Sequence, residues 1–239
     1  MSQSDGVHIR YTTTNFKVTQ MDMNIELARF NMIEQQVRPW DVLDQRVLDL
    51  MSQIPREAFV PEQLRALAFA DTMLPLGNGE VMMEPKLEGR ILQALALQPD
   101  DKVLEVGTGS GYLTALLAAQ ARKVVSVELD GELLESARQR LAERHVDNVN
   151  LHQGNAADGW GSEQPYDAIV LGGSVLAIPQ GLKENMQVGG RLFAVVGEGI
   201  LMKAVLLTRD TIKEWRELVL FETSLPPLHG LSTEPAFRF

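Results

Sequence analysis

The chain has 239 residues, of which 45% are apolar and 23% charged, and a formal net charge of -10. This composition is typical of a globular protein with a full core, and the negative charge disfavours nucleic acid as a partner. With no cysteine and four histidines that lack paired ligand spacing, the sequence predicts no metal site. No apolar run approaches the ~20 residues of a membrane span and no signal peptide is recognisable, so we expect a cytoplasmic protein without membrane contact.

The first part of the chain is predicted to be helical after a polar tail. We expect a tail or edge strand over residues 1–23 and a single domain over 24–239, divided into 24–98, 99–200 and 201–239. Apolar spacing predicts helices from residue 24 to Pro39, over 41–51 and over 62–69, with "PREAFVP" (55–61) as an extended connector. Residues 74–85 are predicted to be a shaped connector, because glycine and proline favour turns, and a helix is predicted over 84–97.

From residue 101 strands and helices alternate. The predicted strands are 102–107, 123–128, 149–154, 167–173 and 191–197, and the predicted helices are 112–120, 133–141 and 180–187. The strands are almost continuous runs of Val, Ile and Leu, which indicates a parallel sheet covered on both faces, as in α/β proteins. Residues 202–210 and 214–223 alternate more like antiparallel strands and are predicted to form the last part of the domain.

The most informative motif is "VLEVGTGSGY", in which a strand leads into Gly107, Gly109 and Gly111 and then into a helix. Glycines allow a ligand to approach the backbone, and the start of the helix offers free N–H groups. The alternative is that these three glycines serve only the geometry of the chain. We interpret the motif as a ligand-binding turn at the carboxyl end of the first strand of the sheet.

Glu128 ends the next predicted strand, 21 residues after Gly107 (128 - 107). A carboxylate there can accept hydrogen bonds from both hydroxyls of a ribose. This fits both NAD and S-adenosylmethionine. The spacing G-x-G-x-G with Glu105 ahead of it suits an amino-acid zwitterion better than a pyrophosphate, so NAD is the weaker hypothesis.

Several ordered segments resemble the protein-L-isoaspartate O-methyltransferase family, from about residue 25 to 228. The glycine turn alone is typical of any class I methyltransferase, whereas the proline-bounded segment is much more specific. The matching segments are "IPREAFVP" (54–61), "LPLGNGEVMMEP" (74–85), "VLEVGTGSGYLTALLA" (103–118), "VVSVE" (124–128), "NVNLHQGNAADGW" (148–160), "YDAIVLGG" (166–173) and "GGRLFAVVG" (189–197).

The resemblance implies a doubly wound, Rossmann-like sheet of seven mostly parallel strands, with one late antiparallel strand and an N-terminal helical extension. It also implies binding of S-adenosylmethionine, with S-adenosylhomocysteine as product, and methylation of the free α-carboxylate of isoaspartyl residues, which starts protein repair. Carried over by position, the methionine end of the cofactor would contact Glu105, Gly107, Gly109 and Gly111, the ribose Glu128, and the adenine Asn155 and Ala156. The last two stand where the family usually has Asp-Gly, and the Asn155 amide can still accept a hydrogen bond from adenine.

The substrate loop departs from the family pattern G-x-G-Q-T-I-S-x-P. Here it consists of Gly77, Gly79, Glu80, Val81, Met82, Met83 and Pro85, with Met83 at the serine position. Methionine cannot donate a hydrogen bond to a carboxylate, and an ionised Glu80 would repel one. No catalytic base is expected, because the acceptor carboxylate is already ionised. The loop predicts that Met83→Ser combined with Glu80→Gln raises isoaspartyl methylation.

Three hypotheses about function therefore stay open at the level of sequence. The chain is an isoaspartyl methyltransferase with an unusual loop; or it methylates a different, less anionic substrate, which is a protein, a peptide or a small molecule; or it binds the cofactor without catalysing transfer. The sequence makes no prediction of the oligomeric state.

Overall fold

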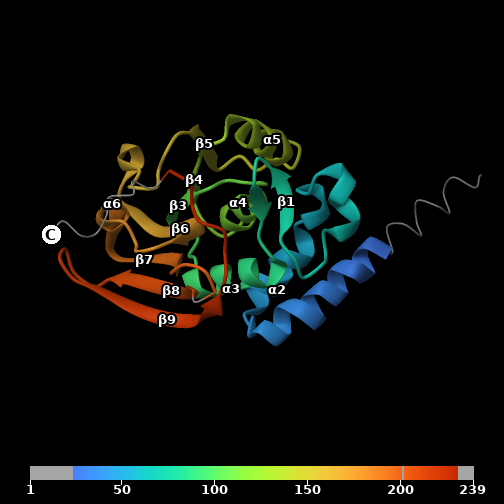
Figure 1. The fold of residues 1–239 in the computed structure, drawn as a ribbon, viewed down its shortest axis with the longest axis horizontal. Helices are drawn as coiled ribbons and strands as arrows, with labels where there is room; N and C mark the ends of the chain where they lie inside the picture. The colour runs from blue at the N-terminus through green and yellow to red at the C-terminus, as the bar shows by residue number, and fades with distance from the viewer. Residues whose placement is uncertain (1–23, 201, 231–239) are drawn as a thin grey trace, which may run out of the picture.

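The computed structural model describes residues 24–200 and 202–230, so the expected tail or edge strand over residues 1–23 lies outside the described part. Seven strands form one sheet in the order β5-β4-β3-β6-β7-β8-β9 (Figure 1). They are β3 (Lys102–Val106), β4 (Lys123–Glu128), β5 (Val149–Gln153), β6 (Tyr166–Val175), β7 (Met186–Val196), β8 (Met202–Arg209) and β9 (Trp215–Thr223).

The strand directions confirm the predicted mostly parallel sheet. Strands β3 to β7 pair in parallel, whereas β8 pairs antiparallel with both β7 and β9. The chain starts the sheet at β3, extends it to β4 and β5 on one side, and then returns to add β6 on the other side of β3. This reversal of winding is the point at which open α/β sheets bind ligands.

Helices cover both faces of the sheet, which explains the continuous apolar runs in the strands. The helices are α2 (Gln45–Gln53), α3 (Pro85–Leu95), α4 (Tyr112–Ala118), α5 (Gly131–Ala142) and α6 (Gln180–Asn185). Val103 belongs to a core cluster with residues of α2, α3 and α4, and its neighbour Leu104 to a second cluster with Leu182 of α6. Both β3 side chains are completely buried.

The N-terminal helical extension differs in detail from the prediction. Residues 24–32 are helical and lead into a π-helical segment (Ile33–Val37) and a 3-10 turn (Arg38–Trp40). Helix α2 begins later than expected, because the Asp44 side chain caps it by accepting a hydrogen bond from the Arg46 N–H. The predicted third helix is a 3-10 helix (Glu62–Leu67), and the predicted extended connector contains a 3-10 turn (Arg56–Ala58).

The predicted connector over residues 74–85 is a small β-hairpin. Strand β1 (Leu74–Gly77) pairs antiparallel with β2 (Glu80–Met82). The turn between them needs positive φ at Asn78 (53°) and Gly79 (86°), a conformation that these two residue types adopt readily. Strands of four and three residues are too short to show a clear alternation, which is why the sequence indicated only a turn.

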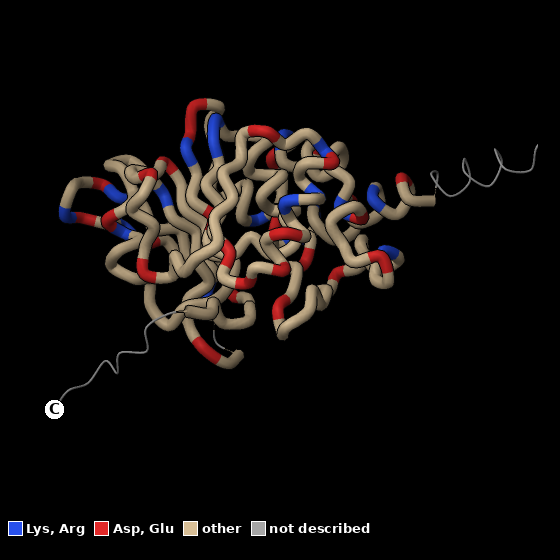
Figure 2. Tube along the Cα trace, turned by 90° about the horizontal axis from the view of Figure 1, so that it is seen from above, with Lys and Arg blue, Asp and Glu red and all other residues tan. Residues whose placement is uncertain are grey.

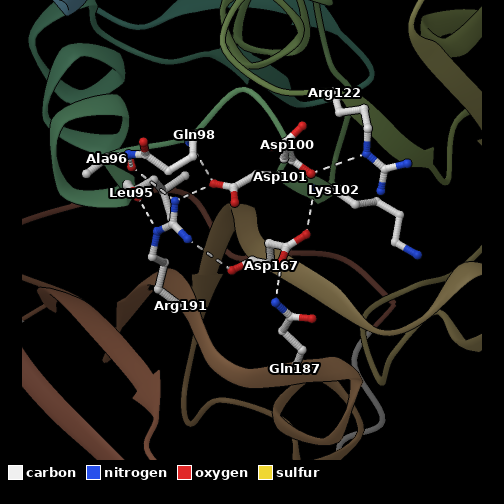
Figure 3. A network of polar contacts seen from close by, with 10 residues as sticks. All are labelled: Leu95, Ala96, Gln98, Asp100, Asp101, Lys102, Arg122, Asp167, Gln187 and Arg191. Atoms are coloured by element: carbon white, nitrogen blue, oxygen red, sulfur yellow. Dashed lines mark hydrogen bonds and ion pairs between the residues drawn. The ribbon is translucent and has the colours of Figure 1, made fainter.

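At the edge where β3 and β6 begin, polar contacts tie the strands to helix α3 (Figure 3). Arg191 of β7 donates to the carbonyls of Leu95 and Ala96 at the end of α3 and forms an ion pair of 2.5 Å with Asp101. Asp167 of β6 accepts a hydrogen bond of 2.7 Å from the Lys102 N–H. This network fixes the C-terminal end of α3 at the edge of the sheet opposite the carboxyl ends of the strands.

Charged residues are dispersed along the tube in Figure 2, and Lys and Arg do not collect into one stripe in this view. The chain carries 22 basic and 32 acidic residues, so acidic side chains predominate. Within residues 24–200 and 202–230, no helix is long and apolar enough to cross a membrane.

Candidate active site

A pocket lies at the carboxyl ends of β3, β4 and β6, where open α/β sheets bind their ligands. The wall is formed by the glycine turn after β3, the end of β4 with residues 154–157, the hairpin with Met83 and Glu88, and residues 226–229. Gly172 and Gly173 of β6, Leu113 of α4 and Leu133 of α5 complete it. The predicted site residues found in the wall are Glu80, Val81, Met82, Met83, Gly107, Gly109, Glu128, Asn155 and Ala156.

The glycine turn requires conformations that other residues rarely adopt. The φ angles of Gly107, Gly109 and Gly111 are 98°, 52° and 84°. Gly107 and Gly109 lie in the pocket wall, whereas Gly111 caps α4 and lies outside it. The predicted loop residues Gly77, Gly79 and Pro85 also lie outside the wall, the glycines at the hairpin turn and Pro85 at the start of α3.

Glu128 lies in the wall with both carboxylate oxygens engaged. Its Oε2 accepts a hydrogen bond of 2.8 Å from the Gly109 N–H, and its Oε1 accepts one of 3.1 Å from the Asp130 N–H. Each carboxylate oxygen has a further lone pair. The Glu128 side chain therefore braces the glycine turn and retains acceptor capacity for a ligand hydroxyl.

Glu105 lies behind the glycine turn, not in the pocket wall as the sequence suggested. It is completely buried, and its Oε2 accepts hydrogen bonds from the hydroxyls of Thr114 (2.5 Å) and Ser126 (2.6 Å). Its Oε1 is buried with no hydrogen-bond partner among the described residues. Burial raises the pKa of Glu105 to about 8, although these two hydroxyl groups act in the opposite direction.

The sequence did not predict a buried ion pair behind the hairpin. Arg56 and Glu88 form this pair, and they are 0% and 2% exposed. Arg56 also donates to the carbonyl of Met83 (2.5 Å) and to that of Ala68 (2.8 Å). It therefore fixes the backbone at Met83, the position where the family pattern has serine. Burial raises the pKa of Glu88 to about 7, and the Arg56 charge lowers it in part. Only the proline-bounded sequence around Arg56 marked this region beforehand.

Residues after β9 cross the pocket and complete its wall. The Ser174 N–H of β6 donates to the Pro226 carbonyl, and the Leu228 N–H donates to the Ser174 carbonyl, both at 2.8 Å. Gly173 permits this crossing, because a Cβ there would lie 2.7 Å from Leu228 backbone atoms. His229, which shows no signal in the sequence, follows directly and lies 2.6 Å from Glu80 between Nδ1 and Oε1.

Asn155 joins the end of β5 to the same C-terminal segment. Its Nδ2 donates to the Gly230 carbonyl (2.7 Å), and its Oδ1 accepts from the Ala157 N–H (3.0 Å). Ala156 is buried in the wall beside it. The amide oxygen that was predicted to face adenine is therefore already engaged once. No cluster of three potential metal ligands occurs among the residues that the structure describes.

This arrangement agrees with the comparisons to known proteins. The family model for protein-L-isoaspartate(D-aspartate) O-methyltransferase matches residues 29–220. The chain belongs to this family. Protein-L-isoaspartate O-methyltransferase 1 of Rhodopseudomonas palustris (strain HaA2) is 39% identical over 203 residues, which cover 84% of this chain and 83% of that protein. Protein-L-isoaspartate O-methyltransferase 2 of Pelobacter propionicus is 38% identical, over 87% and 92% of the two chains.

Solved structures of the family share the fold. A protein-L-isoaspartate O-methyltransferase matches with a TM-score of 0.73 at 22% identity, over 84% of this chain and 66% of that one. A putative family member from Plasmodium falciparum, in complex with S-adenosyl-L-homocysteine, matches with a TM-score of 0.71 at 20% identity, over 83% and 96%. As a member of the isoaspartate O-methyltransferase family, the chain is an S-adenosylmethionine-dependent methyltransferase.

Proposed function

We propose that the pocket binds S-adenosylmethionine and that the enzyme methylates the α-carboxylate of an L-isoaspartyl residue in a protein or peptide. The products are a methyl ester and S-adenosylhomocysteine. The observation that carries this proposal is that the glycine turn, Glu128 and the loop residues Glu80 to Met83 line one cavity. Membership of the isoaspartate O-methyltransferase family supports the choice of acceptor.

The residues around the glycine turn fit this cofactor. Gly107 and Gly109 expose their backbone in the wall, and Glu128 offers spare acceptor capacity to ribose hydroxyls. Behind them, the buried Oε1 of Glu105 has no hydrogen-bond partner among the described residues, which leaves an acceptor for a donor such as the ammonium group of an amino acid. Asn155 and Ala156 would form the adenine side of the pocket.

The task of the chain is to position and desolvate the acceptor. The cofactor, when bound, supplies a methyl group activated by its sulfonium, and the acceptor carboxylate is ionised at neutral pH without a base. Met82 and Met83 are 3% and 7% exposed and give the acceptor side an apolar wall. An apolar surface beside the acceptor disfavours water there and helps to hold the reacting groups together, which favours the displacement.

A second candidate acceptor is a less anionic group. Two features of the wall favour it: Glu80 and Glu88 both contribute carboxylates, and Met83 offers no hydrogen-bond donor. A catalytically silent cofactor-binding protein is the remaining alternative. Each of these hypotheses leads to a different outcome in one pair of measurements.

The experiment combines calorimetric binding of S-adenosylmethionine with base-labile methyl transfer to an isoaspartyl peptide. The same peptide with a normal aspartyl residue is the control. We expect saturable cofactor binding and transfer to the isoaspartyl peptide only. Binding without transfer to either peptide would favour the less anionic acceptor or the silent protein, and absence of binding would overturn the proposal.

A cytoplasmic location stays a prediction.

A further inference from the structure

Two segments that are far apart in the sequence meet over the pocket. Glu80 begins β2 of the hairpin, and His229 follows the C-terminal segment that crosses the end of β6. The Glu80 Oε1 and His229 Nδ1 atoms are 2.6 Å apart, and both residues line the pocket. Their side chains are 36% and 58% exposed, so an incoming substrate can reach them.

The position of His229 is fixed by the backbone on both sides. Before it, the Leu228 N–H donates to the Ser174 carbonyl at 2.8 Å. After it, the Gly230 carbonyl accepts a hydrogen bond of 2.7 Å from Asn155. The contact with Glu80 then holds the ring itself. A histidine held at three points is suited to recognition, because little conformational freedom is lost when a ligand binds.

The pocket wall has an unbalanced charge that His229 can offset. Its carboxylates come from Glu80, Glu88 and Glu128, and Glu88 is neutralised from behind by Arg56. Among the described residues of the wall, none is Lys or Arg, and His229 is the single side chain that can become a cation. An anionic acceptor entering this pocket therefore has one side chain able to supply both positive charge and an N–H donor.

We propose that His229 binds the acceptor carboxylate and that Glu80 is the positioning residue that orients it. With Glu80 accepting the Nδ1–H, the imidazole presents Nε2 to the pocket. When Nε2 also carries a proton, the ring is a cation that donates one hydrogen bond to each of two carboxylates, Glu80 and the acceptor. This inference rests on the proposed function, because it assumes a carboxylate acceptor.

The contact reverses one prediction from the sequence. Considered without His229, Glu80 repels the acceptor, which is why the sequence predicts a gain from Glu80→Gln in combination with Met83→Ser. With His229 beside it, Glu80 stabilises the cation that the acceptor needs, so Glu80→Gln raises the KM for the peptide severalfold. Met83→Ser alone stays beneficial, because a serine hydroxyl adds a donor to the wall.

The test is His229→Gln, with His145→Asn as the matched control, since His145 is exposed and lies outside this pocket. We expect the KM for the isoaspartyl peptide to rise about tenfold or more in His229→Gln, as for loss of a charge-assisted hydrogen bond, while kcat changes less. Binding of S-adenosylhomocysteine and the melting temperature should stay unchanged. When Met83→Ser is added to His229→Gln, the raised KM should fall part of the way back towards the wild-type value.

A second readout separates recognition from a merely structural role. The wild-type enzyme should bind a carboxylate peptide more tightly than the corresponding carboxamide, measured as competing inhibitors, and His229→Gln should lose this preference. An unchanged KM and an unchanged preference in His229→Gln would overturn the role of His229 but would leave the proposed function intact. Loss of S-adenosylhomocysteine binding would also contradict it, because His229 would then support the cofactor. Absence of transfer by the wild type would overturn the proposed function itself.

Discussion

Arg56 is a buried cation whose guanidinium donates hydrogen bonds to two residues of the active-site wall and one residue outside it. It pairs with Glu88, and it donates to the backbone carbonyls of Met83 and Ala68. The guanidinium carbon of Arg56 also lies over the aromatic ring of Tyr112, 5.1 Å from the ring centroid. Removing this cation leaves a buried carboxylate and two carbonyls without their donor, a combination that is costly in a protein interior.

We therefore predict that Arg56→Met lowers the free energy of unfolding by about 3–5 kcal/mol, measured by urea denaturation. The control is Arg38→Met, which breaks the half-exposed Arg38–Glu34 pair and should cost about 0–1 kcal/mol. Arg56→Met should also raise the KM for the peptide, because the Met83 backbone is no longer held. Equal losses of stability in both variants would contradict this role of Arg56.

Glu105 makes stability depend on pH. Burial raises its folded pKa from 4.5 to about 8, so the folded state binds a proton that the unfolded state has already lost in this range. Stability from this group is therefore highest below pH 4.5 and declines as the pH rises towards 8. Glu105→Gln keeps an oxygen for Thr114 and Ser126 but removes the titrating carboxyl group.

The expected result is that Glu105→Gln is more stable than the wild type by up to about 3 kcal/mol at pH 7, with less difference at pH 4.5. Urea denaturation across this pH range measures the slope. Glu88 contributes in the same direction up to pH 7, because its pKa is raised to about 7, so part of the slope persists in the variant. The exposed Glu135→Gln should leave the slope as it is, and a similar flattening there would rule out Glu105 as the source.

At the scale of single residues, the sequence predicted the position of those site residues that a local motif fixes. Gly107, Gly109 and Glu128 lie in the wall because the strand-turn-helix pattern fixes their place. Contacts between distant segments left no such signal. Glu80 and His229 are 149 residues apart in the sequence, and their pairing depends on how the C-terminal segment crosses β6.

The glycine turn joins β3 to α4, and its backbone shape is what the cofactor would contact. Gly107 has a φ of 98°, which side-chain-bearing residues rarely adopt. A Cβ there would lie 3.5 Å from Gly172, an ordinary contact, so the cost of an alanine is conformational rather than steric. Residues forced into such a conformation cost about 1–3 kcal/mol, which the turn would relieve by changing shape.

Gly107→Ala is accordingly predicted to weaken S-adenosylhomocysteine binding at least tenfold in calorimetry, the equivalent of about 1.4 kcal/mol. Gly161→Ala is the control, because its φ is not positive and the nearest atom to an added Cβ is 3.8 Å away. That variant should bind like the wild type. Unchanged binding in Gly107→Ala would show that the cofactor does not depend on the conformation of this turn.

At the scale of elements, helices and strands with long apolar patterns were predicted well, and short elements were predicted poorly. The buried strands and the helices α4 and α5 follow from continuous apolar runs and helical spacing. The hairpin β1–β2 and the 3-10 segments are too short for either pattern to be decisive. Helix α2 begins at Gln45 because Asp44 caps it, a local signal that competes with the apolar spacing extending back to residue 42.

At the scale of the whole molecule, the binding pocket and the Arg191 network, one of the contacts that stabilise the fold, lie at opposite edges of the sheet. The pocket lies at the carboxyl ends of the parallel strands, and the Arg191 network lies where β3 and β6 begin (Figure 3). Helix α3 connects the two edges: its first turn follows the loop that contains Met83, and its last carbonyls accept from Arg191. The fold class was predictable from the alternation of strands and helices, whereas this connection depends on tertiary packing.

The separation of the two edges leads to a prediction about Arg191→Met. This change removes the ion pair with Asp101, which is 11% exposed, and the donors to the carbonyls of Leu95 and Ala96. We expect the free energy of unfolding to fall by about 2–3 kcal/mol, because these partly buried acceptors lose charge-assisted bonds. The pocket wall contains none of these four residues, so S-adenosylhomocysteine affinity and the KM for the peptide should match the wild type below the melting temperature. A rise in KM without loss of stability would instead mean that α3 transmits the disturbance to the loop, and the two edges would then be coupled through this helix.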